Sequence, residues 1–396
     1  MKLRSIKNVN VKNKKILLRI DINSPVKNKI ILDNPRFQEV ASTIKYLLKR
    51  GAKLAILAHQ GREGDLDFTT LKQHAKLLSK YSKIEIEYMP YLFEDQAKEK
   101  ISLLKQGEAI LLENVRKYPD EKSLYKKRYK ELFQNFDIYV NEAFSVSHRN
   151  DASIILPPKF LKSYIGLQFE KELSYLDKIK LNSGNLTILL GGAKVEDYFP
   201  ILKLLKNKSN ILLASGVLAN LFYFSIGQDL GFESKWLESK GYDKFSRKLR
   251  KIYKKHKQQV VLPVDFGMIK KDGSRIDLTI EEFPSDYKIM DIGNKSIELF
   301  NDKIKKSKFI FMKGPAGFSE YKKFSTGTIK ILKQISTVTK NKKIISILGG
   351  GHLSATVEKY NIPNNFTYIS LSGGALIKYL AGEKLPGIKV LEKNKK

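Results

Sequence analysis

The sequence contains no cysteine among its 396 residues. Disulfide bonds, thiolate metal sites and thiol catalysis are therefore excluded, and a reducing compartment is favoured. Long hydrophobic runs are also missing: no stretch has the 18 apolar residues of a membrane span, and the charged start lacks the core of a signal peptide. We therefore expect a soluble cytoplasmic protein that does not bind membranes.

Acidic residues are scarce, with 41 Asp and Glu against 73 Lys and Arg, which gives a formal net charge of +32. Such a charge is typical of proteins that bind polyanions. The basic residues, however, are spread along the whole chain, and no aromatic-plus-basic module such as an RRM signature is present. A solvated basic surface is favoured, no specific nucleic acid is expected, and polyanion binding stays open as an alternative.

The length predicts two domains, and the alternation of β-rich runs with amphipathic stretches predicts an α/β fold with parallel sheets. One clear unit covers residues 33–59. Asp33 or Asn34 can cap a helix that opens with Pro35 and stops at Gly51, and KLAILAH follows as a buried strand. The apolar face of this helix comprises Phe37, Val40, Ile44, Leu47 and Leu48.

Four runs in the first half pass from apolar residues into polar ones at their carboxyl ends; they are ILLRIDIN, KLAILAHQGR, AILLENVR and DIYVNEAF. Ligands of open parallel sheets bind at that edge. Several guanidinium groups gathered there would repel one another unless a small, multiply anionic ligand lay among them. The residues delivered to this edge, or to the helix beside it, are Asp21, Asn23, Arg36, His59, Arg62, Arg116 and Arg149.

Five runs in the second half end instead in glycine; they are LTILLGGAK, NILLASGV, KFIFMKGPAG, KIISILGGG and FTYISLSGG. Glycine lets backbone amides approach a ligand, and a following helix adds free N–H groups, a combination that suits nucleotide phosphates. No run matches the Walker loop or the GxGxxG spacing. An anion site in one half and a nucleotide site in the other predict a small-molecule kinase that closes about a hinge.

The sequence also resembles the phosphoglycerate kinase family over essentially its whole length. The blocks that carry the resemblance are, in order, LLRIDINSPV, LAHQGREGD, LLENVRKYPDE, YVNEAFSVSHR, LLGGAKVED, LPVD, DIGNKSIELF, KGPAGFSE and SGGALIKYLAGEKLPGIKVL. AHQGREGD and the histidine after the triple glycine are most similar to archaeal members. The resemblance implies two Rossmann-like, three-layer αβα domains joined by a hinge helix. Residues 1–168 with 378–396 would bind 3-phosphoglycerate, and residues 169–377 would bind the nucleotide.

The implied reaction is reversible phosphoryl transfer between 1,3-bisphosphoglycerate and ADP, giving 3-phosphoglycerate and ATP. The resemblance places the seven residues of the first half on the 3-phosphoglycerate site, and gives Arg36 and Lys194 catalytic roles beside the transferring phosphoryl group. The implied nucleotide site comprises Gly191, Gly192, Lys194, Gly216, Pro315, Glu320, Gly349, Gly350, Gly351 and His352.

The chain departs from the family pattern mainly on the nucleotide side, at Tyr198, Lys313, Leu353 and Ser372. His352 stands where many relatives carry a magnesium-binding aspartate, and imidazole is a poor Mg²⁺ ligand. We therefore expect no protein-built metal site: nucleotide phosphates and water would hold Mg²⁺, and His352 would contact phosphate or water or cap its helix.

Three readings stay open: an active kinase, a nucleotide-binding relative with weakened catalysis, and a polyanion-binding protein. A monomer is the expectation, with a homodimer as the alternative.

Overall fold

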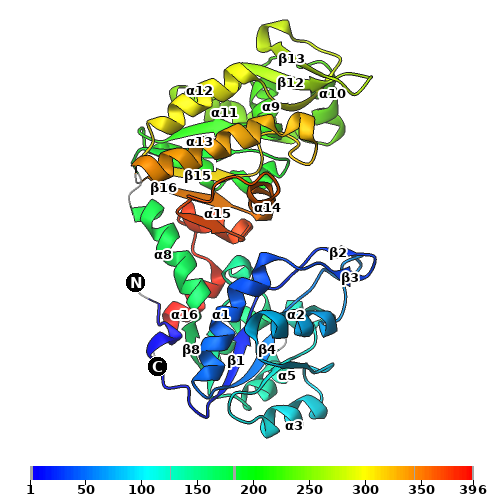
Figure 1. Cartoon of the computed structure of the whole chain (residues 1–396), viewed down its shortest axis with the longest axis vertical. Helices are drawn as coiled ribbons and strands as arrows, with labels where there is room; N and C mark the ends of the chain where they lie inside the picture. Colours follow the sequence, from blue (N-terminus) through cyan, green and yellow to red (C-terminus); the bar gives the residue numbers. More distant parts are fainter. Residues whose placement is uncertain (1–2, 125, 182–183, 343, 395–396) are drawn as a thin grey trace. The chain divides into compact units, whose positions relative to one another are not determined.

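The computed structural model describes residues 3–124, 126–181, 184–342 and 344–394. The chain forms two compact units, Met1–Ser174 with Lys384–Lys396, and Tyr175–Glu383 (Figure 1). The division runs through helix α8 (Leu167–Leu181). It falls a few residues after the boundaries expected at 168/169 and 377/378.

Packing explains where the division falls. The start of α8 belongs to the first unit, because the Phe169 ring packs edge-on against Phe144 at 5.4 Å. The segment after α15 (Gly374–Leu380) belongs to the second unit, where Glu383 forms an ion pair with Lys203 at 3.5 Å. Which substrate each unit binds stays a prediction.

The described residues of the first unit form eight strands in two sheets and the helices that surround them. Its strands are β1 (Lys15–Arg19), β2 (Val26–Lys27), β3 (Ile30–Ile31), β4 (Lys53–Leu57), β5 (Ile86–Tyr88), β6 (Ala109–Leu111), β7 (Ile138–Asn141) and β8 (Lys162–Ile165). Its helices are α1 (Pro35–Lys49), α2 (Lys72–Ser82), α3 (Asp95–Leu103), α4 (Asp120–Ser123), α5 (Lys126–Phe133), α6 (Ala152–Ile155), α7 (Pro157–Phe160) and α16 (Pro386–Lys393).

The main sheet of this unit is parallel, with the order β5-β6-β4-β1-β7-β8. Helices α1 and α2 share a core with one face of the strands, which includes Ile16 and Leu54. Helices α3 and α5 share a core with the other face, which includes Leu17 and Ala55. Alternate residues of each strand thus face opposite helix layers, which makes three layers (Figure 1).

Helix α1 forms as its sequence predicts. The Asn34 side chain accepts a hydrogen bond from the Arg36 amide, and Pro35 occupies the first turn. The helix ends before Gly51, whose φ of +77° suits glycine. The expected apolar face is confirmed, since Phe37, Val40, Ile44, Leu47 and Leu48 are all buried.

In the part of the second unit that the structure describes, nine strands form two sheets. Its strands are β9 (Leu186–Leu190), β10 (Ile211–Ala214), β11 (Val260–Val261), β12 (Asp265–Ile269), β13 (Arg275–Thr279), β14 (Lys288–Ile292), β15 (Phe309–Lys313), β16 (Ile345–Gly349) and β17 (Tyr368–Ser370). Besides α15, its helices are α9 (Gly216–Ser225), α10 (Phe232–Ser239), α11 (Ser246–His256), α12 (Asn294–Lys305), α13 (Thr326–Lys342) and α14 (Gly351–Lys359).

All five glycine-ended runs are strands of one parallel sheet, with the order β11-β10-β9-β15-β16-β17. Helices α12, α13 and α14 share a core with the strand residues Leu189, Leu213 and Met312 on one face. The α/β class with mainly parallel sheets is therefore confirmed. Because the strands are parallel, their glycine ends lie along the same edge.

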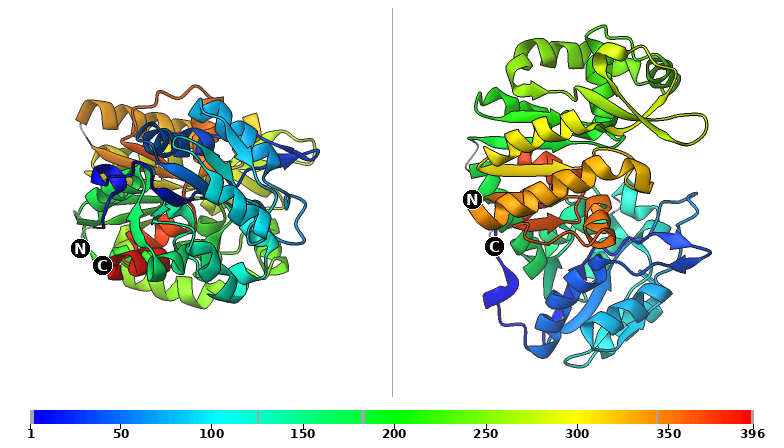
Figure 2. Two further views of the ribbon diagram at one scale, coloured as in Figure 1. Left: turned by 90° about the horizontal axis from the view of Figure 1, so that it is seen from below. Right: turned by 45° about the horizontal axis from the view of Figure 1, so that its top comes forward.

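A three-stranded antiparallel sheet, β13-β12-β14, was not expected from the sequence. It has a core of its own around Phe266, Met268 and Phe283. Figure 2 shows it at the tip of the second unit. Across the described residues, no helix has the length and apolarity needed to cross a membrane.

Candidate active site

The parallel sheet of the first unit gathers the predicted anion-binding residues at one edge. Asp21 and Asn23 follow β1, His59 follows β4, Arg116 follows β6 and Arg149 follows β7. These strands are neighbours in the order β6-β4-β1-β7. Adjacent parallel strands end at the same edge, so side chains far apart in the sequence come together here.

Asp21 is the buried centre of this cluster. Its carboxylate accepts hydrogen bonds from the Arg36 guanidinium at the start of α1 and from the Ser145 hydroxyl. The Asn23 amide donates to its other oxygen at 3.1 Å. Burial opposes the charged form, but the Arg36 charge and the hydrogen bonds from Ser145 and the Asn23 backbone amide outweigh it and hold the pKa of Asp21 below its ordinary value. Asp21 is therefore a carboxylate at neutral pH.

His59 is buried beside Asp21, with Nε2 at 3.9 Å from the Asp21 Oδ1 atom. Burial lowers the pKa of His59 well below its ordinary value, and nearby arginines lower it further against the pull of Asp21. Its Nδ1 atom lies 3.1 Å from Nη2 of Arg19. Because a guanidinium can only donate, Nδ1 must accept, and the proton of the neutral ring is on Nε2. His59 thus presents an N–H donor toward the site.

Arg116 and Arg149 complete the positive side of the cluster. Arg116 donates to the Gly61 carbonyl, and Arg149 donates to Asp151 at 2.9 Å. Burial and then the Arg149 charge lower the pKa of Arg116 to about 10, so it remains charged at neutral pH. An arginine whose charged form is disfavoured by a neighbouring arginine in this way favours an anion between the two.

The remaining two predicted residues of the first unit differ from each other. Asn23 is tied into the site, since its Oδ1 atom accepts the Gly61 amide at 2.9 Å. Arg62 is exposed, and the structure does not bring its side chain into the cluster. Its position next to Gly61 places it at the rim.

In the second unit, several glycines are required by the protein's own packing. A Cβ atom on Gly191 would lie 2.1 Å from the Pro315 carbonyl oxygen, and one on Gly314 would lie 2.2 Å from the Gly191 carbonyl oxygen. Gly216 has a φ of +53°, and a Cβ atom there would lie 2.8 Å from the Gly192 amide nitrogen. These residues bring the ends of β9, β10 and β15 into backbone contact.

Gly351 is different. It opens α14, and a Cβ atom there would meet nothing within 4 Å. Its φ is not in the left-handed region either. Neither the fold nor the backbone conformation therefore requires glycine at this position. No side chain caps α14, so the free N–H groups of its first turn are available to an anion.

Three charged side chains lie at the ends of β9 and β15. Lys194 and Asp197 are exposed, whereas Lys313 is partly buried. Burial lowers the pKa of Lys313 to about 8, Asp197 raises it and Lys194 lowers it further. The three groups are thus close enough to influence one another.

The other predicted residues of this unit lie around the same edge. Glu320 and His352 are exposed, and Gly349 ends β16. The Lys359 ammonium donates to the Glu320 carbonyl at 3.2 Å, which ties the loop after β15 to α14.

Three of the sequence departures have structural consequences. The Tyr198 hydroxyl donates to the Gly191 carbonyl, so it fixes the glycine loop. Leu353 is buried in the core with α12 and α13 and cannot present its side chain to a ligand. Ser372 is buried, and its amide donates to the Ser370 hydroxyl at 3.1 Å.

The phosphoglycerate kinase family model matches residues 6–383. The chain belongs to this family. It is 36% identical to the phosphoglycerate kinase of Archaeoglobus fulgidus over 98% of this chain and 96% of that one. It is 39% identical to that of Methanothermus fervidus over 96% of this chain and 95% of the other. The resemblance to archaeal members is thereby confirmed.

Solved phosphoglycerate kinase structures agree. That of Pyrococcus horikoshii OT3 has a TM-score of 0.91 at 32% identity and covers 99% of both chains. That of Coxiella burnetii has a TM-score of 0.83 at 28% identity and covers 100% of both. The chain therefore has the two-domain, Rossmann-like α/β fold and the phosphotransferase activity of the phosphoglycerate kinase family.

Sequence reasoning missed Arg19 as part of the side-chain cluster around Asp21. Arg19 is 1% exposed and donates to Ser153 Oγ at 2.8 Å, besides its contact with His59. Ser153 in turn donates to Glu121 at 2.7 Å, and Tyr129 donates to the same carboxylate at 2.6 Å. The sequence feature that could have indicated Arg19 is a charged residue inside the apolar run ILLRIDI. A charged residue at this point is also typical of an ordinary strand end.

We predict that Arg19→Met destabilises the fold strongly. Burial raises the pKa of Glu121 and the Arg19 charge offsets part of that rise, so removing Arg19 leaves a buried carboxylate without its counter-charge. Breaking such a pair costs about 3–5 kcal/mol, measured as the change in free energy of unfolding in urea. The double variant Arg19→Met with Glu121→Gln should recover part of this loss. Equal destabilisation of the single and double variants would contradict the pairing.

Proposed function

We propose that this protein catalyses reversible phosphoryl transfer between 1,3-bisphosphoglycerate and ADP, giving 3-phosphoglycerate and ATP. Family membership supports the reaction. The observation that carries the assignment of the substrate site is the cluster of Asp21, Arg36, His59, Arg116 and Arg149 at one sheet edge. We propose that the first unit binds 3-phosphoglycerate, the second binds the nucleotide, and hinge closure excludes water from the transfer.

The chemistry of the first cluster suits 3-phosphoglycerate. The Asp21 carboxylate accepts a hydrogen bond from the substrate hydroxyl. The Nε2–H group of neutral His59, the side-chain amide of Asn23 and the guanidinium groups of Arg116 and Arg149 bind its carboxylate and phosphate. Arg62, at the rim, would reach the same ligand from outside the cluster. No general base is required, since the group that accepts the phosphoryl is already an anion.

Arg36 has a catalytic role in this proposal. Its guanidinium is held at the start of α1 by Asp21, and the side chain remains 24% exposed. A cation aimed at the charge of the phosphoryl group in transit stabilises the transition state more than the ground state, and therefore raises kcat. Lys194, exposed after β9, would accompany the same group from the nucleotide side.

A coupled assay with 3-phosphoglycerate and ATP tests the proposal. We predict turnover by the wild-type protein and a loss of about 10²- to 10³-fold in kcat for Arg36→Ala. Arg50→Ala, at the exposed other end of α1, is the matched control and should keep full activity. Absence of turnover in a folded wild-type protein would favour a weakened relative instead.

The nucleotide proposal rests on the glycine edge of the second unit. Gly191, Gly192 and Gly216 form its close-packed backbone floor, and Pro315 adjoins it. Gly349, Gly350 and Gly351 lead into the uncapped N-terminus of α14, whose N–H groups suit the phosphates. Glu320, on the loop after β15, would accept the ribose hydroxyls.

We predict that Gly351→Ala raises the KM for ATP by about tenfold without lowering the unfolding temperature. The added Cβ meets no protein atom, so it would obstruct only a ligand. Gly191→Ala is the contrasting variant, because its Cβ would clash with Pro315 and destabilise the fold itself. His352→Ala in the same assay tests the adjacent side chain: an unchanged KM would exclude a phosphate contact by His352, which does not cap α14 either. An unaltered KM in Gly351→Ala would place the phosphates elsewhere.

Mg²⁺ is the usual partner of the nucleotide in this family. Among the described residues, no group of three or more His, Asp and Glu side chains could hold a metal ion. Because the imidazole of His352 is a poor Mg²⁺ ligand, we propose that Mg²⁺ is held chiefly by nucleotide phosphates and water, with Asp197 as an outer contact. The ion would neutralise phosphate charge during transfer.

Lys313 predicts a pH dependence of nucleotide binding. Its pKa is lowered to about 8, so the ammonium fraction of the free protein falls between pH 7 and 9. Phosphate prefers the charged form, and the KM for ATP should therefore rise across this window. Lys313→Gln should remove that part of the rise, whereas Lys308→Gln, at the exposed start of the same strand, should retain it. Identical pH profiles for all three proteins would contradict a phosphate contact by Lys313.

A further inference from the structure

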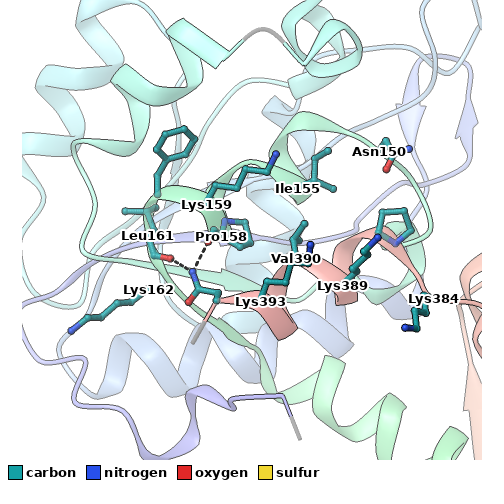
Figure 3. Close-up of a pocket in the computed structure, with 13 residues that line it drawn as sticks. Asn150, Ile155, Pro158, Lys159, Leu161, Lys162, Lys384, Lys389, Val390 and Lys393 are labelled. Atoms are coloured by element: carbon teal, nitrogen blue, oxygen red, sulfur yellow. Dashed lines mark hydrogen bonds between the residues drawn. The ribbon is translucent and has the colours of Figure 1, made fainter. Parts of the chain in front are cut away.

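A lysine-lined groove lies in the first unit, apart from the residues placed above in the substrate site. Its volume is about 720 Å³, within the usual range for ligand pockets. One wall is the segment from α6 through α7 to β8, and the other is α16 (Figure 3). Five of its lining residues are lysines, and none is acidic: Lys159, Lys162, Lys384, Lys389 and Lys393.

The lysines come from both walls of the groove. Lys389 and Lys393 are one helical turn apart on α16, and with Pro386 and Val390 they form a single face of that helix. Lys159 projects from α7 on the opposite wall, while Lys162 and Lys384 stand toward the two ends of the view (Figure 3). Positive charge is thus concentrated around one hollow.

These charges are not compensated by the described part of the protein. None of the five lysines forms an ion pair with a described residue, whereas Lys117 and Lys122 of the same unit pair with Glu113 and Asp151 at 2.7 and 2.5 Å. Like charges placed around a concave surface repel one another and raise the local concentration of anions. A ligand with several negative charges would relieve that repulsion.

An extended acidic peptide does not fit the edge strand beside the groove. Strand β8 ends the sheet, but its outer edge is already used. The Ile165 amide donates to the Arg4 carbonyl at 2.9 Å, and the Ser163 amide donates to Asn394 Oδ1 at 3.2 Å. Asn394 also donates to the carbonyls of Pro158 and Leu161. A peptide therefore cannot add to the sheet here; the chain segments near the two termini occupy the edge (Figure 2).

The composition of the groove distinguishes phosphate from carboxylate ligands. No arginine lines it, so no planar fork is available and binding would depend on the charge density of the ligand, which is higher for a phosphate group than for a carboxylate. Ammonium groups act as point charges and suit phosphate oxygens in many orientations. We propose that this groove binds a chain of two or more phosphate groups, held between Lys159 on one wall and Lys389 and Lys393 on the other.

The test is calorimetric titration of the full-length protein with inorganic tripolyphosphate at about 0.15 M salt. Saturating ADP and 3-phosphoglycerate keep the proposed substrate sites filled. We expect saturable binding that Lys389→Gln with Lys393→Gln weakens by about tenfold or more. The matched control is Lys126→Gln with Lys130→Gln, which changes the net charge equally at the same spacing on exposed α5 and should alter affinity less than about twofold.

Two further experiments test the same proposal. Lys159→Gln, on the opposite wall, should also weaken binding, and all variants should keep wild-type kcat because none belongs to the substrate site. A parallel titration with ATP distinguishes a free phosphate chain from one carried by a nucleotide. If nucleotides enter the groove, the wild-type protein should show an additional binding event that the groove variants lack. Absence of saturable tripolyphosphate binding, or equal weakening by the groove and control variants, would overturn the proposal.

Discussion

The buried guanidinium of Arg19 is the interaction on which the first site depends. It lies inside the apolar sheet, where an unpaired charge would be very costly. Its donors are used by Ser153, the Ile20 carbonyl and His59, and Glu121 supplies the opposite charge through Ser153. One side chain of β1 thereby joins β4, α4 and α6. The same contact sets the His59 tautomer, so a structural requirement determines which hydrogen-bond donor faces the cluster around Asp21.

The glycines of the second site serve two physical purposes that a sequence cannot separate. Gly191, Gly216 and Gly314 allow backbone segments of this chain to touch one another. Gly351 meets no such segment, and its lack of a side chain leaves open space at a helix N-terminus. Only the three-dimensional surroundings of each residue distinguish a glycine needed for folding from one that leaves room for a ligand.

Local patterns predicted much of this molecule because they are governed by short-range physics. The cap and apolar face of α1, and the strands that end in polar residues or in glycine, could all be read from spacing. Two kinds of feature could not. The burial of Arg19 depends on Glu121 and Ser153, more than a hundred residues away. Strand β13 is largely half-buried, so its alternation of polar and apolar residues gives a weak signal.

A residue that matches a family position can be given a role only when its surroundings in the structure are known. Leu353 follows the glycines at the end of β16, yet its side chain is part of the core. Tyr198 departs from the family pattern but makes a hydrogen bond to the backbone of the loop after β9. Sequence matching therefore identifies the region of a site more securely than it identifies each contact.

The chain is rich in lysine, yet its buried cationic site uses arginine, and the pKa values explain the choice. Partial burial lowers the pKa of Lys313 to about 8, close to the point at which an ammonium loses its charge under physiological conditions. Arg116, beside two other arginines, still has a pKa of about 10 and keeps its charge. A crowded anion site that must stay positive in the absence of substrate can therefore be built from guanidinium groups, whereas lysines can remain charged mainly where water reaches them. The two kinds of basic residue therefore serve different environments in this protein. Arginine carries the positive charge where the side chain is buried, and lysine carries it on the solvated surface.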